Sequence, residues 1–285
     1  MKQRIQDIMS DYDGTLVPTA HVKDPKANTI PSELEEILEK VSFELPVCII
    51  STKDFEFLKN KTAFARILSC MMGIETLVLK NHGSSRTIEK CLLHADLQVL
   101  QRNSEALEAI AEELSSDEEF SYALVERKHT SDGILAGLTV DWRHLGGDDW
   151  SYYKRGVTHF ISRMVANLKK PPVPIADIYV QKYSAHPFID IYSTECNKGI
   201  AFDTILSELG YGSLDGKGTL YLGDSENDNP AFRKAGISIG IRSDARVNPK
   251  LDCSYFLDYK QLSSFLMNLR NDNYLFSDEL LEART

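Results

Sequence analysis

The sequence predicts an α/β fold in which an α+β domain is inserted into a Rossmann-like core built around a parallel sheet. Near both ends of the chain, short apolar runs alternate with helical stripes, as a parallel sheet with crossover helices requires. The middle of the chain instead alternates apolar and polar residues, which is typical of an antiparallel sheet. Turn-rich segments at 81–85 and 184–187 separate the two patterns, so we expect residues 1–84 and 187–285 to form the core and 85–186 the inserted domain.

Five apolar runs are predicted to be strands of the core sheet, and two amphipathic patterns are predicted to be helices that pack on it. The first helix is expected to begin near Ser32, because Ser32 and Glu35 have the spacing of a capping box. The second begins near Lys198, and its apolar stripe ends at Leu209. The expected core strands are 5–9, 47–50, 76–79, 219–222 and 237–239.

The inserted domain is predicted to be an antiparallel sheet with helices over one face. Residues 135–142 place Leu138 and Val140 on one side of a strand and Thr139 on the other. Further strands are expected at 178–181 and 188–192, and apolar helical stripes occupy 107–114 and 157–168.

The overall composition argues for a protein that acts on a small molecule. With 32 basic and 42 acidic residues the formal net charge is −10, which disfavours nucleic acid or an anionic membrane as a partner. The five cysteines are scattered and form no C-x-x-C pair, so a zinc site is not expected. Because the first residues contain no apolar leader segment and no apolar run approaches about 18 residues, we expect a cytoplasmic protein.

The first chemical motif is a pair of carboxylates, Asp11 and Asp13, directly after the first predicted strand. Ligands of α/β sheets bind at the carboxyl ends of the strands, and a turn there can point both side chains into one crevice. Two adjacent carboxylates repel each other, so a divalent cation between them is expected. The same residues with Gly14 are equally compatible with an ordinary Asx turn, so this motif alone leaves both interpretations open.

Three further segments follow predicted strands or open a predicted helix. Ser51 and Thr52 follow the second strand, Lys198 opens a helix beside backbone N–H donors, and Asp224 begins a second acidic cluster. Each has an ordinary alternative: Ser51 as a helix N-cap, Lys198 as a surface lysine and Asp224 as a turn residue. Their common placement at sheet edges and a helix start indicates a combined phosphate and metal site.

Taken in order, these segments resemble the four-motif signature of the haloacid dehalogenase superfamily of phosphatases, and the insertion resembles the α/β cap of its sugar-phosphatase branch. Within that branch, Asp11 through Pro18, the His82-Gly83 pair and the stretch from Glu126 to Ser131 resemble the trehalose-6-phosphate phosphatase family. Two departures concern the substrate. Ser51-Thr52-Lys53 stands where that family has Ser-Gly-Arg, and the segment after Asp224 is closer to mannosyl-3-phosphoglycerate and sucrose-phosphate phosphatases.

The resemblance implies a Mg²⁺-dependent hydrolysis of a sugar phosphate through an aspartyl-phosphate, with trehalose 6-phosphate as the first candidate substrate. It implies that Asp11 is the nucleophile and that Asp13 is the general acid and base. The implied phosphate-binding residues are Ser51, Thr52 and Lys198. The implied metal ligands are Asp11, Asp224 and the backbone carbonyl of Asp13, with Asn227 and Asp228 orienting the site from behind.

The resemblance also implies that the inserted domain selects the sugar through Glu126, Lys128, Ser131 and Arg143. Glu126 and Lys128 lie two residues apart on a predicted strand, so they would project from one face. A cross-strand salt bridge is the alternative role for both residues. For the whole protein, a phosphohexomutase that passes the phosphate to another sugar and a non-catalytic sugar-phosphate sensor are the competing functions.

Overall fold

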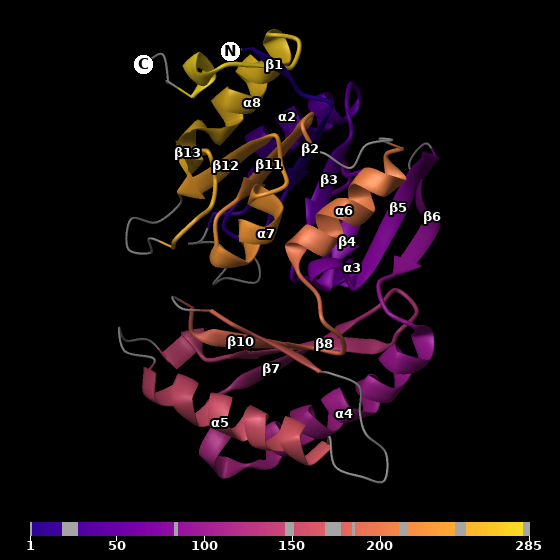
Figure 1. Cartoon of the computed structure of the whole chain (residues 1–285), viewed down its shortest axis with the longest axis vertical. Coiled ribbons are helices and arrows are strands. Elements are labelled where there is room, and N and C mark those ends of the chain that lie inside the picture. The colour runs from indigo at the N-terminus through magenta and orange to yellow at the C-terminus, as the bar shows by residue number, and fades with distance from the viewer. Residues whose placement is uncertain are drawn as a thin grey trace. The chain divides into compact units, whose positions relative to one another are not determined.

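The computed structural model describes residues 2–18, 28–82, 85–145, 151–168, 178–183, 186–210, 216–242 and 249–281. The chain divides into two compact units, each with its own sheet (Figure 1). Unit 1 comprises Met1–Thr52, Phe57–Leu92 and Asn197–Thr285, and unit 2 comprises Lys53–Glu56 and Leu93–Cys196. The predicted fold class is confirmed: a mostly parallel α/β core carries an inserted α+β unit.

Unit 1 is built around an eight-stranded sheet. Its strands are parallel from β13 through β4, whereas β5 is antiparallel to β4. The central strand β2 has β3 on one side and β11 on the other, so the chain order reverses at β2. In spatial order the strands are β13 (Tyr255–Asp258), β12 (Ile237–Arg242), β11 (Thr219–Gly223), β2 (Asp7–Ser10), β3 (Val47–Ile50), β4 (Ile67–Cys70), β5 (Glu75–His82) and β6 (Ser85–Leu93).

Helices pack on this sheet through the apolar stripes seen in the sequence. Helix α6 (Lys198–Glu208) and the short α7 (Asn229–Phe232) share a core with Met9 and Tyr221 of the sheet. Helix α2 (Ser32–Ser42) buries Leu34, Ile37, Leu38 and Val41 and packs against β3 and α8 (Leu262–Asn271). Figure 1 shows α6 and α7 on one face of the sheet. The remaining short elements are α3 (Phe55–Leu58) and the pair β1 (Gln3–Arg4) and β14 (Leu275–Phe276).

Two local predictions for unit 1 are corrected. Pro31 is the N-cap of α2 and no side chain caps the helix, because Ser32 already lies inside the first turn; the capping box is therefore wrong. The strand predicted at 76–79 exists as part of β5, but it runs antiparallel to β4. Only the short helical turn Met71–Gly73 and Ile74 separate β4 from β5, and such a short connection cannot return a strand in the parallel sense. Strands β4, β6 and β13 were not predicted.

Unit 2 contains a four-stranded antiparallel sheet in the order β7 (Leu124–His129), β8 (Leu135–Asp141), β10 (Phe188–Tyr192) and β9 (Tyr179–Lys182). Helices α4 (Leu97–Ser116) and α5 (Ser151–Leu168) lie on one side of this sheet (Figure 1). Their apolar stripes form one core with Leu138, Val140, Ile189 and Ile191. The predicted antiparallel sheet with helices over one face is confirmed.

The predicted domain boundaries are shifted by the pairing of two strands. Strand β6 joins the sheet of unit 1, so unit 2 resumes at Leu93 and not at 85. Strand β10 pairs with β8 and β9, so unit 2 extends to Cys196 and not to 186. A strand belongs to the sheet that satisfies its backbone hydrogen bonds, and the local sequence does not reveal that partner. Of the predicted linkers, 83–84 and 184–185 lie outside the described residues.

Within the described part of the chain, no helix combines the length and the apolar character that crossing a membrane would demand.

Candidate active site

The candidate site lies where the strand order of unit 1 reverses, at the carboxyl end of β2. Asp11 follows β2 directly, and its backbone N–H donates to the carbonyl of Leu222 on β11 at 2.9 Å. Ser51 and Thr52 follow β3, and Asp224 follows β11, so neighbouring strands end at the same edge of the sheet. Such a reversal point leaves a crevice between diverging connections, which is where α/β sheets bind ligands.

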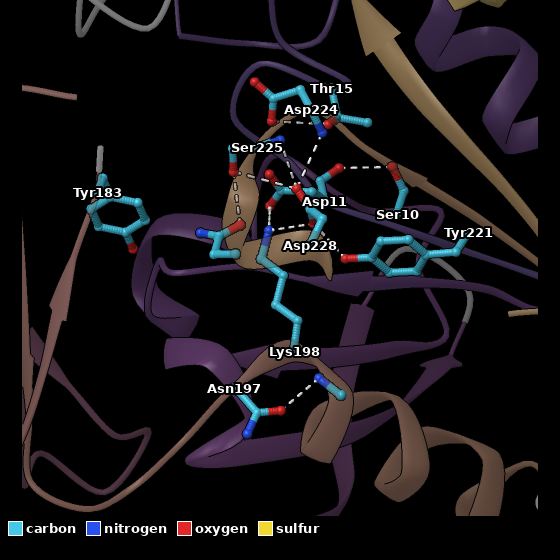
Figure 2. A network of polar contacts seen from close by, with 12 residues as sticks. Ser10, Asp11, Thr15, Tyr183, Asn197, Lys198, Tyr221, Asp224, Ser225 and Asp228 are labelled. Atoms are coloured by element: carbon cyan, nitrogen blue, oxygen red, sulfur yellow. Dashed lines mark hydrogen bonds and ion pairs between the residues drawn. The ribbon is translucent and has the colours of Figure 1, made fainter. Parts of the chain in front are cut away.

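Lys198 lies at the centre of the site, fully buried between two carboxylates (Figure 2). Its Nζ is 2.9 Å from Oδ1 of Asp11 and 2.7 Å from Oδ1 of Asp228. Asn197 caps α6 and places Lys198 at the first helical position, with its side-chain oxygen accepting the N–H groups of Gly199 and Ile200. The prediction that backbone N–H groups at this helix start are free to bind phosphate is therefore corrected for Gly199 and Ile200. Both of these N–H groups already donate to the side chain of Asn197.

Asp228 is the most heavily hydrogen-bonded carboxylate of the site. Besides Lys198, its Oδ1 accepts the Tyr221 hydroxyl at 2.6 Å. Its Oδ2 accepts the backbone N–H groups of Asp224 at 3.1 Å and Ser225 at 3.0 Å. Tyr221 lies on β11, within a run that was predicted only as an apolar core strand. Its phenol hydroxyl, just before the acidic cluster, is the feature that could have indicated the contact with Asp228. Asn227, next to Asp228, bonds Ser225 at 2.8 Å.

Three carboxylates converge beside Lys198. Oxygen atoms of Asp11, Asp224 and Asp228 all lie within 4.8 Å of one another. Gly14 makes this possible, because its φ is +82° and a Cβ added there would lie 2.0 Å from Oδ2 of Asp224. The cluster contains Asp228, which was expected to orient the metal site but not to bind the metal. Asp13, which was expected to contribute its backbone carbonyl, is not one of the three clustered carboxylates.

The electrostatics of the cluster favour an additional cation. Burial raises the pKa of the Asp11 carboxyl to about 7, with Lys198 opposing the rise and Asp228 adding to it. Burial, Asp11 and Asp228 together raise the pKa of Asp224 well above its ordinary value. Burial by itself would lower the pKa of Lys198, but Asp11 and Asp228 raise it. Carboxylate oxygens are the preferred ligands of Mg²⁺, so this donor set fits a divalent magnesium ion.

Asp13 lies beside the cluster and is only partly buried. The turn that holds it is closed by the Gly14 N–H, which donates to the carbonyl of Val17 at 2.8 Å. Its Oδ1 accepts the side-chain amide of Asn28 at 3.4 Å. Asn28 was not singled out from the sequence, because it is a polar residue far from the four motifs.

The predicted sugar-binding residues all lie in unit 2, but their surroundings differ. Glu126 is half-exposed and its Oε2 is 3.5 Å from the ammonium of Lys53. Ser131 lies in the turn after β7. Arg143 forms an ion pair of 2.6 Å with Asp141 and stacks over the ring of Phe188.

Lys128 is buried in unit 2 and forms an ion pair with Asp190 at 3.1 Å. The Asp190 carboxylate also accepts the hydroxyl groups of Thr139 and Tyr183, the latter at 2.6 Å. Burial by itself would raise the pKa of Asp190, but Lys128 and the two hydroxyl donors lower it. Glu126, Thr139 and Asp190 are register partners on adjacent strands, so they share the sheet face opposite the helices.

Comparison with known proteins gives consistent matches. Residues 162–260 match the haloacid dehalogenase-like hydrolase family. The chain is 24% identical over 272 residues to trehalose 6-phosphate phosphatase RA3 of Zea mays, covering 92% of this chain and 68% of that protein. This chain therefore spans about two thirds of the length of that relative.

Two solved structures share the fold. A trehalose-6-phosphate phosphatase related protein superposes with a TM-score of 0.63 at 15% identity, covering 94% of this chain and 98% of that one. The C-terminal domain of C. albicans trehalose-6-phosphate phosphatase gives 0.62 at 20% identity, covering 94% and 93%. The match of residues 162–260 to the haloacid dehalogenase-like hydrolase family and the similarity to trehalose-phosphate phosphatases agree with the resemblance found in the sequence, and the two solved structures show that the fold is shared.

Proposed function

We propose that this chain is a Mg²⁺-dependent sugar phosphatase that works through an aspartyl-phosphate on Asp11. The observation that carries the proposal is the buried ion-pair network at the carboxyl end of β2, in which Lys198 bridges Asp11 and Asp228. A carboxylate nucleophile and a fixed ammonium side by side suit attack on a phosphate ester, because the ammonium offsets the negative charge of both reactants.

In the first step, Asp11 Oδ attacks phosphorus, the bond from phosphorus to the sugar oxygen breaks, and Asp13 protonates that leaving oxygen. In the second step, Asp13 takes a proton from water, which attacks the acyl phosphate and releases inorganic phosphate, restoring the Asp11 carboxylate. Lys198 holds a phosphate oxygen and the nucleophile in place. Ser51 and Thr52, at the end of the neighbouring strand, contribute hydroxyl donors to the same phosphate.

Asp11 and Asp224 are the proposed side-chain ligands of Mg²⁺, with the carbonyl of Asp13 as a third. Bound there, the ion would supply positive charge that reduces the repulsion between the carboxylates and a phosphate dianion. Asp228 is assigned an orienting role, because its two oxygens already accept Lys198, Tyr221 and two backbone N–H groups. Asn227 supports the same turn through its bond with Ser225.

For the substrate, we infer a phosphorylated sugar, with trehalose 6-phosphate as the first candidate. The Zea mays relative and the C. albicans domain are trehalose-6-phosphate phosphatases, and the polar face of the unit 2 sheet carries charged and hydroxyl groups suited to sugar hydroxyls. Unit 2 would therefore act as the specificity domain, with the half-exposed Glu126 as its first recognition residue, whereas Lys128 would meet the sugar only by leaving its buried ion pair with Asp190. Ser131 and Arg143 would complete the contacts.

The direct test is release of inorganic phosphate by the purified chain from trehalose 6-phosphate, sucrose 6-phosphate, mannosyl-3-phosphoglycerate and p-nitrophenyl phosphate. We expect turnover with Mg²⁺, none in excess EDTA, and recovery when Mg²⁺ is restored. The folded Asp11→Asn variant should lose activity by about a thousandfold or more. Phosphate transfer to a second sugar without release would establish a mutase, and binding without either reaction a sensor; both outcomes would refute the proposal.

A further inference from the structure

Asn28 is a buried amide that contacts Asp13 and belongs to none of the four sequence motifs. Its side chain is 5% exposed, and its Nδ2 donates to Oδ1 of Asp13 at 3.4 Å. Asn28 lies fifteen residues after Asp13 in the chain, so the contact is made by the fold and not by the local turn.

Two neighbouring side chains hold the backbone of Asn28. The ammonium of Lys61 donates to its carbonyl at 2.8 Å, and the hydroxyl of Tyr12 donates to the same carbonyl at 3.4 Å. Lys61 also lies 3.8 Å from the ring centroid of Phe57, and that ring contacts Tyr12 edge-on. Two side chains therefore hold the backbone carbonyl of Asn28.

The side-chain oxygen of Asn28 is in an energetically unfavourable environment. The Oδ1 atom of Asn28 is buried and has no hydrogen-bond partner within the described residues. A buried acceptor without a partner is destabilising, so the Asn28 side chain is not explained by a gain in stability within the described residues.

A neutral amide suits a carboxylate that must both give and take a proton. An amide carries no net charge, so its N–H can orient a carboxyl group by a hydrogen bond in either protonation state. Here the ammonium of Lys61 bonds the backbone of Asn28, and the amide of Asn28 faces the carboxylate. The contact thus holds one oxygen of Asp13 in place.

We propose that Asn28 is a positioning residue for Asp13, which orients the general acid towards the leaving oxygen of the phosphate ester. The inference rests on the proposed phosphatase function. It assigns to Asn28 an effect on the step that protonates the leaving group and little effect on attack at phosphorus.

The test measures kcat/KM for aryl phosphates from p-nitrophenyl phosphate to phenyl phosphate. This parameter reports steps up to formation of the acyl phosphate, and phenol, the poorer leaving group, depends more on protonation. Asn28→Leu and the isosteric Asn28→Asp should lower kcat/KM for phenyl phosphate about tenfold and for p-nitrophenyl phosphate about twofold at most. Asn268→Leu, an exposed asparagine of α8, is the matched control and should change neither value.

A double-variant cycle separates positioning from general damage. In an Asp13→Asn background, Asn28→Asp should cause little further loss, because the residue through which it acts is already disabled. Equal losses for both aryl phosphates, or a full additional loss in the Asp13→Asn background, would overturn the inference. If the wild-type chain released phosphate from none of the esters, the proposed function itself would fail, and that outcome is distinct from the other two.

Discussion

Unit 1 and unit 2 each bury a lysine, but the two ammonium groups have different electrostatic surroundings. Lys198 lies beside a cluster of three carboxylates, from Asp11, Asp224 and Asp228. Lys128 is paired with a single carboxylate among the described residues, that of Asp190, which also accepts two hydroxyl groups.

The pKa directions express this difference. In unit 1 burial, and after it the excess of negative charge, raise the pKa values of Asp11 and Asp224, whereas in unit 2 the pairing with Lys128 lowers the pKa of Asp190. A cluster whose carboxylates resist ionisation favours the binding of a further cation, whereas a buried pair of opposite charges is already balanced. Charge imbalance therefore distinguishes the candidate catalytic site from the polar network of unit 2, although both contain a buried lysine.

The largest expected effect is on turnover when Lys198 is replaced. Lys198→Met should lower kcat for a sugar phosphate by about a hundredfold to a thousandfold, because the proposed donor to the reacting phosphate is lost. Phosphate release at saturating Mg²⁺ measures the effect. Lys234→Met, which removes an exposed lysine paired with Asp203, is the control and should keep normal kcat. Equal activity of the two variants would contradict the role assigned to Lys198.

The next effect concerns stability in unit 2. Lys128→Met should lower the free energy of unfolding by about 3–5 kcal/mol, because it leaves the Asp190 carboxylate buried without its counter-charge. Urea unfolding monitored by circular dichroism gives the value. The same Lys234→Met control should cost less than about 1 kcal/mol, as exposed ion pairs do. A loss for Lys128→Met no greater than that of the control would show that the buried pair is not balanced as described.

A smaller effect is expected at Glu126, which is half-exposed on the polar face of the unit 2 sheet. Glu126→Ala should lower kcat/KM for trehalose 6-phosphate about tenfold, because a hydrogen bond through a charged group is lost, and should leave p-nitrophenyl phosphate hydrolysis unchanged.

Glu108→Ala is the matched control for Glu126→Ala, since Glu108 forms a comparable ion pair with Arg127 on the helix-covered side. An unchanged kcat/KM for the sugar phosphate in Glu126→Ala would contradict a role in sugar binding and would leave the ion pair with Lys53 as the only role of Glu126 seen among the described residues.

The smallest effect is a pH dependence of stability that arises from Asp190. Its folded pKa is lowered, so the stabilisation is fully present above the unfolded pKa of about 3.9 and is lost as pH falls through the folded value. The difference in unfolding free energy between wild type and Asp190→Asn should therefore be constant from about pH 5 upwards and should shrink below about pH 4. A difference that grows on acidification would reverse the sign assigned to this group.

Several site residues could be predicted because they stand next to strand ends or a helix start that the sequence reveals. Asp11 follows an apolar run, Asp224 follows another, and Lys198 opens an amphipathic helix. Tyr221, Asn28 and Asp190 could not be predicted in the same way. Tyr221 and Asp190 lie within strands where their side chains resemble ordinary core or alternating residues, and Asn28 gains its partner only through tertiary contact.

The sequence by itself determined the α/β class, the unit inserted into the core, and the carboxylates and lysine of the candidate site. These features depend on local periodicity and on residues beside the ends of elements, which are readable within a few positions. Only the tertiary structure decided that β6 joins the core sheet, that β10 joins the sheet of unit 2, and that Lys128 pairs with Asp190. Each of these contacts joins residues that are far apart in the chain. A strand needs hydrogen-bond partners and a buried charge needs a counter-charge, but the local sequence does not specify which distant segment supplies them.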